Sequence, residues 1–249
     1  MEWTSFLWIF LPGILAGLCQ GISGLGSGQI IMLFYPAILG MIGSASVLQC
    51  TCIITCLYLV MKYRKYVCMR IIFRPLIFYF PFYLIMIRFA VGVDVRFLTF
   101  LFGVVIILTA VYMLFFSEKL RITPSLGAEA VCAALGGIID AFFGNGGLPI
   151  IVDLLSVLDD KEKYIGTVQM YFLVTCTFGT VVRIWKGLYT VSMIPYTAIS
   201  VAALMIGVRI SVEIVKKVNT AQVKKFVCIC MMFAGIILIA DNWSAVIGS

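Results

Sequence analysis

Apolar runs follow one another along almost the whole chain, and this succession limits the possible folds more than any other feature. A helix needs about 20 apolar residues to cross a bilayer. The runs lie near residues 4–20, 29–42, 45–61, 71–91, 95–116, 124–143, 147–158, 164–182, 190–210 and 221–240. Because only 12% of the 249 residues are charged and the mean hydropathy is +1.15, the apolar surface must face lipid. The sequence therefore predicts an all-α polytopic membrane protein.

Histidine is absent from the sequence. This excludes Ser-His and Cys-His catalysis, His-ligated metals and histidine proton relays, so we expect neither an enzyme nor a cofactor or metal. The G-x-S-G at residues 21–24 matches intramembrane serine proteases, but those need a histidine base. The nine cysteines are scattered through apolar runs, and we expect most of them to be small buried hydrophobes.

Two glycine-rich stretches, at residues 21–28 and 144–147, interrupt the apolar runs. Each is followed by an arm, 29–42 or 147–158, that is too short to span comfortably. Glycine costs about 1 kcal/mol per residue inside a helix, so both clusters are expected to open the helix. Open backbone at membrane depth is tolerated only inside protein or beside a cavity. Each stretch is therefore predicted to be the non-helical tip of a helical hairpin.

An offset of 120 residues brings the two halves of the chain into register. The matching pairs are Gly17 with Gly137, Gly24 with Gly144, Gly26 with Gly146, Gln49 with Gln169, Thr55 with Thr175 and Cys56 with Cys176. Several matches in order at one offset indicate an internal duplication. We predict a first membrane repeat at 1–116, a linker at 117–123 and a second repeat at 124–249. Each repeat is a glycine-tipped helical hairpin plus three transmembrane helices.

Basic residues in short loops predict the orientation. Residues 62–74 contain five basic side chains and no acid, and residues 209–225 contain five against Glu213. Both segments are expected in the cytoplasm. Three spans per repeat is an odd number, so the second repeat is inverted, and both termini lie outside the cell (cytoplasmic) membrane. The loop at 183–189, with Arg183 and Lys186, then also falls outside.

The net charge of +7 is explained by this orientation, so we expect no nucleic-acid partner. The expected partners are a small anionic substrate and the lipid bilayer, and a homodimer is left open.

The glycine tips also predict a binding site. Free N–H groups at helix starts and successive glycine amides bind anions, and broken helices supply such sites in transporters with inverted repeats. The predicted substrate-binding residues are Ser23, Gly24, Gly26, Ser27, Gly28, Gln49, Gly144, Asn145, Gly146, Gly147 and Gln169. In the alternative interpretation the glycines only allow close helix packing, and the glutamines bond one helix to another.

Asp140 lies in an apolar stretch just before the second tip. An acid at membrane depth is costly and is by default a functional candidate. Because burial favours the protonated form, Asp140 is the candidate for proton coupling, and Asp153 on the following arm is a second candidate. An interior hydrogen bond from the tip to Asp140 is the alternative.

The glycine motifs and the duplicated layout resemble the sulfite exporter TauE/SafE family of membrane permeases. The first copy reads Gly17-Leu-Cys-Gln-Gly21-Ile-Ser-Gly24-Leu-Gly26-Ser-Gly28, and the second reads Gly137-Ile-Ile-Asp-Ala-Phe-Phe-Gly144-Asn-Gly146-Gly147-Leu-Pro149. Ser27, Gln29 and the early Pro149 depart from the family pattern. The resemblance implies transport of sulfite, organosulfonates or similar sulfur-containing anions, often as export. The residues alone predict only a small anion, carried by alternating access.

Three other functions remain open. In a thiosulfate-type transporter, cysteine thiols would contact the substrate. Cys52 and Cys56 share a helix face, and Cys176 matches Cys56 across the repeat. A passive anion channel would carry flux without a coupled ion. A structural or assembly membrane protein would bind no anion.

Overall fold

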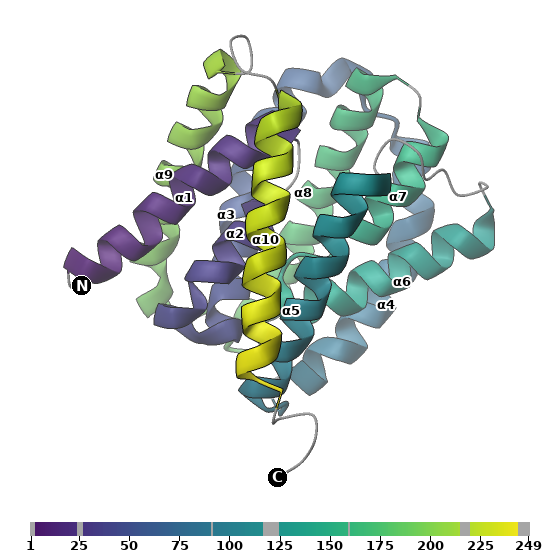
Figure 1. The fold of residues 1–249 in the computed structure, drawn as a ribbon. Coiled ribbons are helices and arrows are strands. Elements are labelled where there is room, and N and C mark those ends of the chain that lie inside the picture. The colour runs from purple at the N-terminus through teal and green to yellow at the C-terminus, as the bar shows by residue number, and fades with distance from the viewer. Residues whose placement is uncertain are drawn as a thin grey trace. The chain divides into compact units, whose positions relative to one another are not determined.

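The computed structural model describes residues 3–23, 27–90, 92–116, 125–158, 160–214 and 220–243. In these residues every regular element is helical (Figure 1). The first half of the chain contains α1 (Trp3–Ser23), α2 (Ser27–Phe34), α3 (Pro36–Tyr63), η1 (Arg64–Tyr66), α4 (Met69–Ala90), α5 (Val95–Val111) and η2 (Tyr112–Phe116). The second half contains α6 (Leu126–Phe143), α7 (Gly147–Val157), α8 (Lys161–Trp185), η3 (Val191–Met193), α9 (Ile194–Ile214) and α10 (Thr220–Asp241). The predicted all-α class is confirmed.

Five helices of the described chain are long and apolar enough to cross a membrane. They lie at Pro36–Tyr66, Met69–Ala90, Leu126–Phe143, Glu162–Trp185 and Val191–Ser211. Shorter apolar helices lie at Phe6–Gly21, Val95–Val111 and Met231–Asp241. These helices agree with a multi-pass membrane protein, whereas the inverted relation between the two halves stays a prediction.

The helices that follow the glycine stretches are short. α2 has 8 residues and α7 has 11, so at 1.5 Å per residue they are about 12 and 16 Å long against a hydrocarbon core of about 30 Å. The prediction of short arms is therefore confirmed. The first arm ends earlier than predicted because Pro36 begins α3, in which Gly40 is non-helical with φ 66° and ψ 171°.

The chain divides into two compact units, and each takes segments from both halves. Unit 1 comprises Met1–Met41, Gly92–Lys119 and Ala202–Ser249, and unit 2 comprises Ile42–Val91 and Leu120–Val201. The helices α3 and α9 each continue from one unit into the other. The predicted boundaries at 116 and 124 concern the duplication and stay a prediction.

In unit 1, α1 packs closely on α9 through a stripe of small residues. A Cβ on Gly17 would lie 2.9 Å from the Cα of Gly207, and one on Gly21 would lie 2.7 Å from the Cβ of Ser211. Real Cβ contacts are longer than this, so only glycine permits the approach of the two helices. For these two motif glycines the structure shows the close packing that the alternative interpretation proposed.

In unit 2, α4 packs along α6. A Cβ on Gly137 would lie 2.7 Å from the carbonyl oxygen of Tyr79, so this glycine lets the two backbones touch. The largest fully buried side chains of the unit include Arg183, Tyr79, Tyr83 and Tyr171. The interior of unit 2 therefore carries polar groups that need partners.

The helix α8 extends to Trp185 and includes Arg183. The prediction that Arg183 lies in an outer loop is therefore wrong, because its side chain is fully buried. A buried guanidinium is stable only with hydrogen-bond acceptors around it. These acceptors form the centre of the site described next.

Candidate functional site

The buried carboxylate of Asp140, in the last turn of α6, accepts three hydrogen bonds. Gln49 Nε2 donates to Oδ2 over 3.0 Å, and the backbone N–H of Gly146 donates to Oδ1 over 3.0 Å. The hydroxyl of Tyr79 also donates to Oδ2. Three donors offset much of the cost of burying the acid, so unit 2 holds a specifically bound carboxyl group in its interior.

The second glycine stretch forms the non-helical tip that the sequence predicts. α6 ends at Phe143, and Gly144 takes the left-handed conformation with φ 65° and donates its N–H to the carbonyl of Asp140 over 2.8 Å. A Cβ on Gly144 would also lie 2.6 Å from the carbonyl oxygen of Ala45 on α3. α7 then begins at Gly147. The amide freed at Gly146 binds a carboxylate of the chain itself.

The guanidinium of Arg183, in the last turn of α8, donates four hydrogen bonds. Nε donates to Gln49 Oε1 over 2.9 Å and Nη1 to Ser46 Oγ over 3.4 Å. Nη2 donates to the carbonyls of Asp140 and Ala141 over 3.2 and 2.7 Å. These carbonyls carry the negative end of the α6 dipole, which a cation stabilises. The four bonds occupy four of the five guanidinium N–H groups.

The Gln49 amide connects the two charged side chains. Its Oε1 accepts from Arg183, and its Nε2 donates to Asp140. Tyr83 donates to the same Oε1 over 3.3 Å. A Cβ on Gly179 would lie 2.5 Å from both amide heteroatoms, so the absence of a side chain there makes room for the amide. Its partners fix its orientation.

Three buried polar atoms on α8 have no hydrogen-bond partner among the described residues. They are the hydroxyl of Tyr171, Oε1 of Gln169 and Oγ1 of Thr180. The Tyr171 ring packs edge-on against Tyr79, with centroids 6.0 Å apart. A buried hydroxyl without a partner is costly, so Tyr171 is a candidate donor to a ligand beside the Asp140 cluster.

The other predicted binding residues of the second half belong to unit 2 as well. Asn145 is half-buried, and Gln169 is buried. A Cβ on Gly147 would lie 2.5 Å from Cζ of Phe172, so this glycine is closely packed. The structure places Gln49, Asp140 and the second tip within one unit, and their role in binding substrate stays a prediction.

The first glycine stretch belongs to unit 1. Gly24 and Gly26 lie outside the described residues, as does the side chain of Ser23. Ser27 is buried and donates to Gln20 Oε1 over 2.8 Å, and Gly28 is buried at the start of α2. The neighbouring Gln29 has a buried Oε1 with no hydrogen-bond partner among the residues that the structure describes. These residues stay predicted binding residues.

Sequence reasoning missed Arg183, Tyr79, Tyr83 and Gly179 as members of the site. For Arg183 a signal existed, since a charge next to an apolar run of membrane length is itself a functional hypothesis. The tyrosines gave no such signal because the chain contains 11 of them, most in apolar runs. In the described residues there is no cluster of three or more His, Cys, Asp or Glu side chains that could hold a metal.

The site combines a guanidinium, a carboxyl group and neutral donors in a helical interior. Such a set can bind an oxyanion and exchange a proton, and it contains no activated nucleophile. A family model described as "Sulfite exporter TauE/SafE" matches residues 9–238, nearly the whole chain. No curated protein and no solved structure matches the chain.

Proposed function

The chain belongs to the sulfite exporter TauE/SafE family, and on this premise we propose that the Asp140–Gln49–Arg183 cluster is where it binds its substrate. The family transports sulfur compounds across membranes and is not an enzyme family. The proposed substrate is a small sulfur-containing anion such as sulfite or an organosulfonate.

The fully buried Arg183 is the single observation that carries this proposal. A guanidinium inside an apolar helix bundle is expensive, and its planar fork matches the oxygens of a sulfite or sulfonate group. The four bonds to the protein and the neighbouring Tyr83 hydroxyl engage the fork, so a ligand would bind it by replacing one of these partners. An incoming oxyanion would compete with the Ser46 hydroxyl, whose bond to Nη1 is the longest at 3.4 Å.

The unpartnered hydroxyl of Tyr171 supplies a second, uncharged donor. Its ring touches that of Tyr79, which binds Asp140. A ligand beside Asp140 would satisfy the Tyr171 hydroxyl, which has no hydrogen-bond partner among the described residues. Neutral donors of this kind add specificity without adding charge.

The coupling ion in this proposal is a proton that binds to the Asp140 carboxylate. An anion that enters beside an ionised carboxylate is repelled, and a proton on Asp140 removes that repulsion. Its three hydrogen-bond donors hold the carboxylate, so protonation would release at least one of them. We therefore propose that sulfur-anion transport is coupled to a proton through Asp140.

Alternating access would accompany this exchange of partners. The two halves are proposed to be inverted repeats that rock against each other, with both termini outside the cell membrane. The Ser46 hydroxyl, which accepts from Arg183, donates to the Ile42 carbonyl of its own helix over 2.8 Å and lies 3.3 Å from the Leu188 carbonyl oxygen in the loop after α8.

The test measures thermal stabilisation of the purified protein by sulfite, thiosulfate, short sulfonates and carboxylates, because a ligand of the native state raises its melting temperature. Uptake into proteoliposomes is measured in parallel. We expect Arg183→Lys to abolish both the stabilisation by sulfite and transport. The matched control is Arg88→Lys, at an exposed position in the last turn of α4.

Tyr171→Phe separates binding from folding. It removes a hydroxyl that has no partner in the described part of the chain, so the melting temperature without ligand should not fall. The sulfite affinity should fall about tenfold, which corresponds to one lost hydrogen bond. Full sulfite stabilisation of both Arg183→Lys and Tyr171→Phe would place the substrate site elsewhere.

A further inference from the structure

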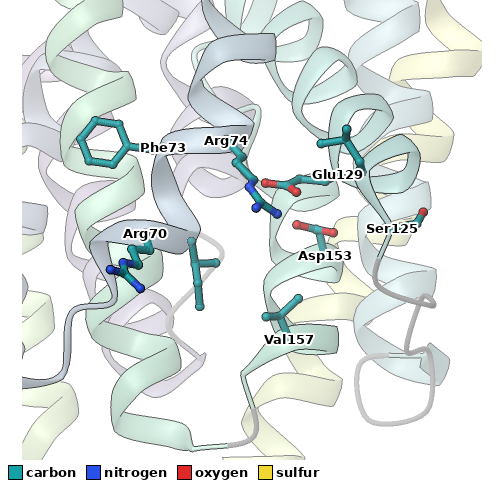
Figure 2. A pocket seen from close by; sticks show the side chains of 9 residues that line it. Arg70, Phe73, Arg74, Ser125, Glu129, Asp153 and Val157 are labelled. Atoms are coloured by element: carbon teal, nitrogen blue, oxygen red, sulfur yellow. The ribbon is translucent and has the colours of Figure 1, made fainter.

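A second polar site lies in unit 2 at the ends of three helices. A pocket of about 620 Å³ opens between α4, α6 and α7 (Figure 2). It is lined by Arg70, the second residue of α4, by Leu126, the first of α6, and by Val157, the last of α7. Because α4 and α6 are candidate spans, this pocket lies where a span meets the membrane boundary, away from the buried tip of unit 2.

The walls of the pocket carry opposite charges. Arg70 and Arg74 lie one turn apart on α4 and are both exposed. Glu129 of α6 and Asp153 of α7 stand opposite, and Figure 2 shows the Arg74 guanidinium directed toward their carboxylates. Asp153 is only 5% exposed, although it belongs to an apolar arm.

This arrangement selects against ions of a single sign. A simple anion on the two arginines would meet two carboxylates across the pocket, and a simple cation on the carboxylates would meet two guanidinium groups. A ligand that carries an oxyanion at one end and an ammonium at the other satisfies both walls. Arginine suits the oxyanion, and a primary ammonium supplies three N–H donors for the carboxylates.

The rim of the pocket is apolar. Phe73 and Leu126 are each 61% exposed, and Val157 is 42% exposed. In a membrane-spanning chain such side chains face acyl tails. A headgroup in the pocket would therefore continue into tails that lie along these residues.

We propose that this pocket binds a zwitterionic ligand in which an oxyanion and a primary ammonium are joined by a short linker. This chemistry is shared by the headgroup of an aminophospholipid and by a free aminoalkyl phosphate or sulfonate. The oxyanion lies on Arg74 and the ammonium lies between Glu129 and Asp153, while Arg70, one turn away on α4, adds positive charge to the arginine wall. The site is separate from the proposed transport site and does not depend on it.

The test uses the full-length protein in detergent and follows its melting temperature during titration with lipids. Phosphatidylethanolamine should raise the melting temperature of the protein at about tenfold lower concentration than phosphatidylglycerol or phosphatidylcholine. Phosphatidylglycerol lacks the ammonium, and the ammonium of phosphatidylcholine has no N–H. Soluble phosphoethanolamine, compared with ethyl phosphate, tests the free ligand. If phosphatidylethanolamine and phosphoethanolamine both stabilise the protein, the pocket binds the free zwitterion as well as the lipid. If phosphatidylethanolamine alone stabilises it, the pocket binds the lipid headgroup only.

Two variants test the two walls. Asp153→Asn should remove the preference for phosphatidylethanolamine over phosphatidylglycerol, and Arg74→Gln should weaken binding of both about tenfold. Arg88→Gln, at the other end of α4, is the control and should change neither. Because Arg74 is exposed, its replacement leaves folding intact even where Asp153→Asn does not. Equal stabilisation by all three lipids, or unaltered binding in Arg74→Gln, overturns the proposal.

Discussion

Gly179 makes room for the amide that connects Arg183 to Asp140, so Gly179→Ala tests the role of this connection. The added Cβ would lie 2.5 Å from both Nε2 and Oε1 of Gln49. Ordinary van der Waals contacts begin at 3.4 Å, so the amide must retreat by roughly 0.9 Å. Such a displacement lengthens the 3.0 Å bond from Gln49 to Asp140 beyond hydrogen-bond range.

The expected cost follows from the bonds that are lost. A hydrogen bond to a charged group contributes about 1.5–3 kcal/mol, and the amide makes one such bond to each charged partner. Replacement of glycine by alanine within a helix raises the free energy of unfolding by about 1 kcal/mol. Loss of one bond therefore lowers the free energy of unfolding by about 0.5–2 kcal/mol, which for a chain of this size lowers the melting temperature by about 1–8 °C.

The assay combines thermal unfolding of purified protein with sulfite uptake into proteoliposomes. The matched control is Gly127→Ala on α6, where an added Cβ meets nothing within 4 Å, and its melting temperature should stay the same or rise slightly. Gly179→Ala should also slow transport, because both charged groups lose their shared partner.

A double-mutant cycle identifies the cause. Gln49→Ala removes the side chain that the new methyl group would displace, so in this background Gly179→Ala should cost nothing further. If Gly179→Ala destabilises the protein equally in both backgrounds, the amide is not its target. If the single variant transports sulfite like the wild type, the connection through Gln49 has no part in transport.

Three further substitutions test other parts of the site. Asp140→Asn should flatten the pH dependence of sulfite uptake, since a proton can no longer be exchanged; a retained pH profile assigns coupling to another group. Gly144→Ala should cost about 1–2 kcal/mol for the left-handed conformation, and more for the contact with Ala45, as a urea titration in detergent would register. Ser46→Ala frees one donor of Arg183, so the sulfite affinity should rise or stay equal in the thermal assay, and a fall would show that the hydroxyl binds substrate.

The helical fold could be predicted because lipid permits few alternatives. Apolar runs of spanning length admit only helices, and glycine clusters predicted the break at Gly144–Gly147 and the short α7 after it. The break at Gly40 was missed, since a single glycine inside an apolar run has no distinctive pattern. The division into two units also gave no sequence signal, because it depends on contacts between segments far apart in the chain.

Of the Asp140–Gln49–Arg183 cluster, the acid and the amide could be singled out from the sequence, but the cation could not. Asp140 and Gln49 stood out as polar residues in apolar runs, and the structure joins them by a hydrogen bond. Arg183 was assigned to a loop because the apolar run before it was taken to end at residue 182. Its burial depends on the carbonyls at the end of α6, which the sequence does not reveal as acceptors. The packing roles of Gly17 and Gly21 likewise depend on partners on α9.

The amide between Arg183 and Asp140 explains how one site could hold both an anion and a proton. A direct contact between the two charges would neutralise both and would be hard to open in a low dielectric. With Gln49 between them, the guanidinium and the carboxylate make no direct contact through the acid's oxygens, and the carboxylate is held by donors that a proton can replace. Protonation of Asp140 would end the need for the bond from Gln49 Nε2, and the amide would then be free to turn with Arg183 toward the substrate. The sequence of events that this predicts is proton first and anion second.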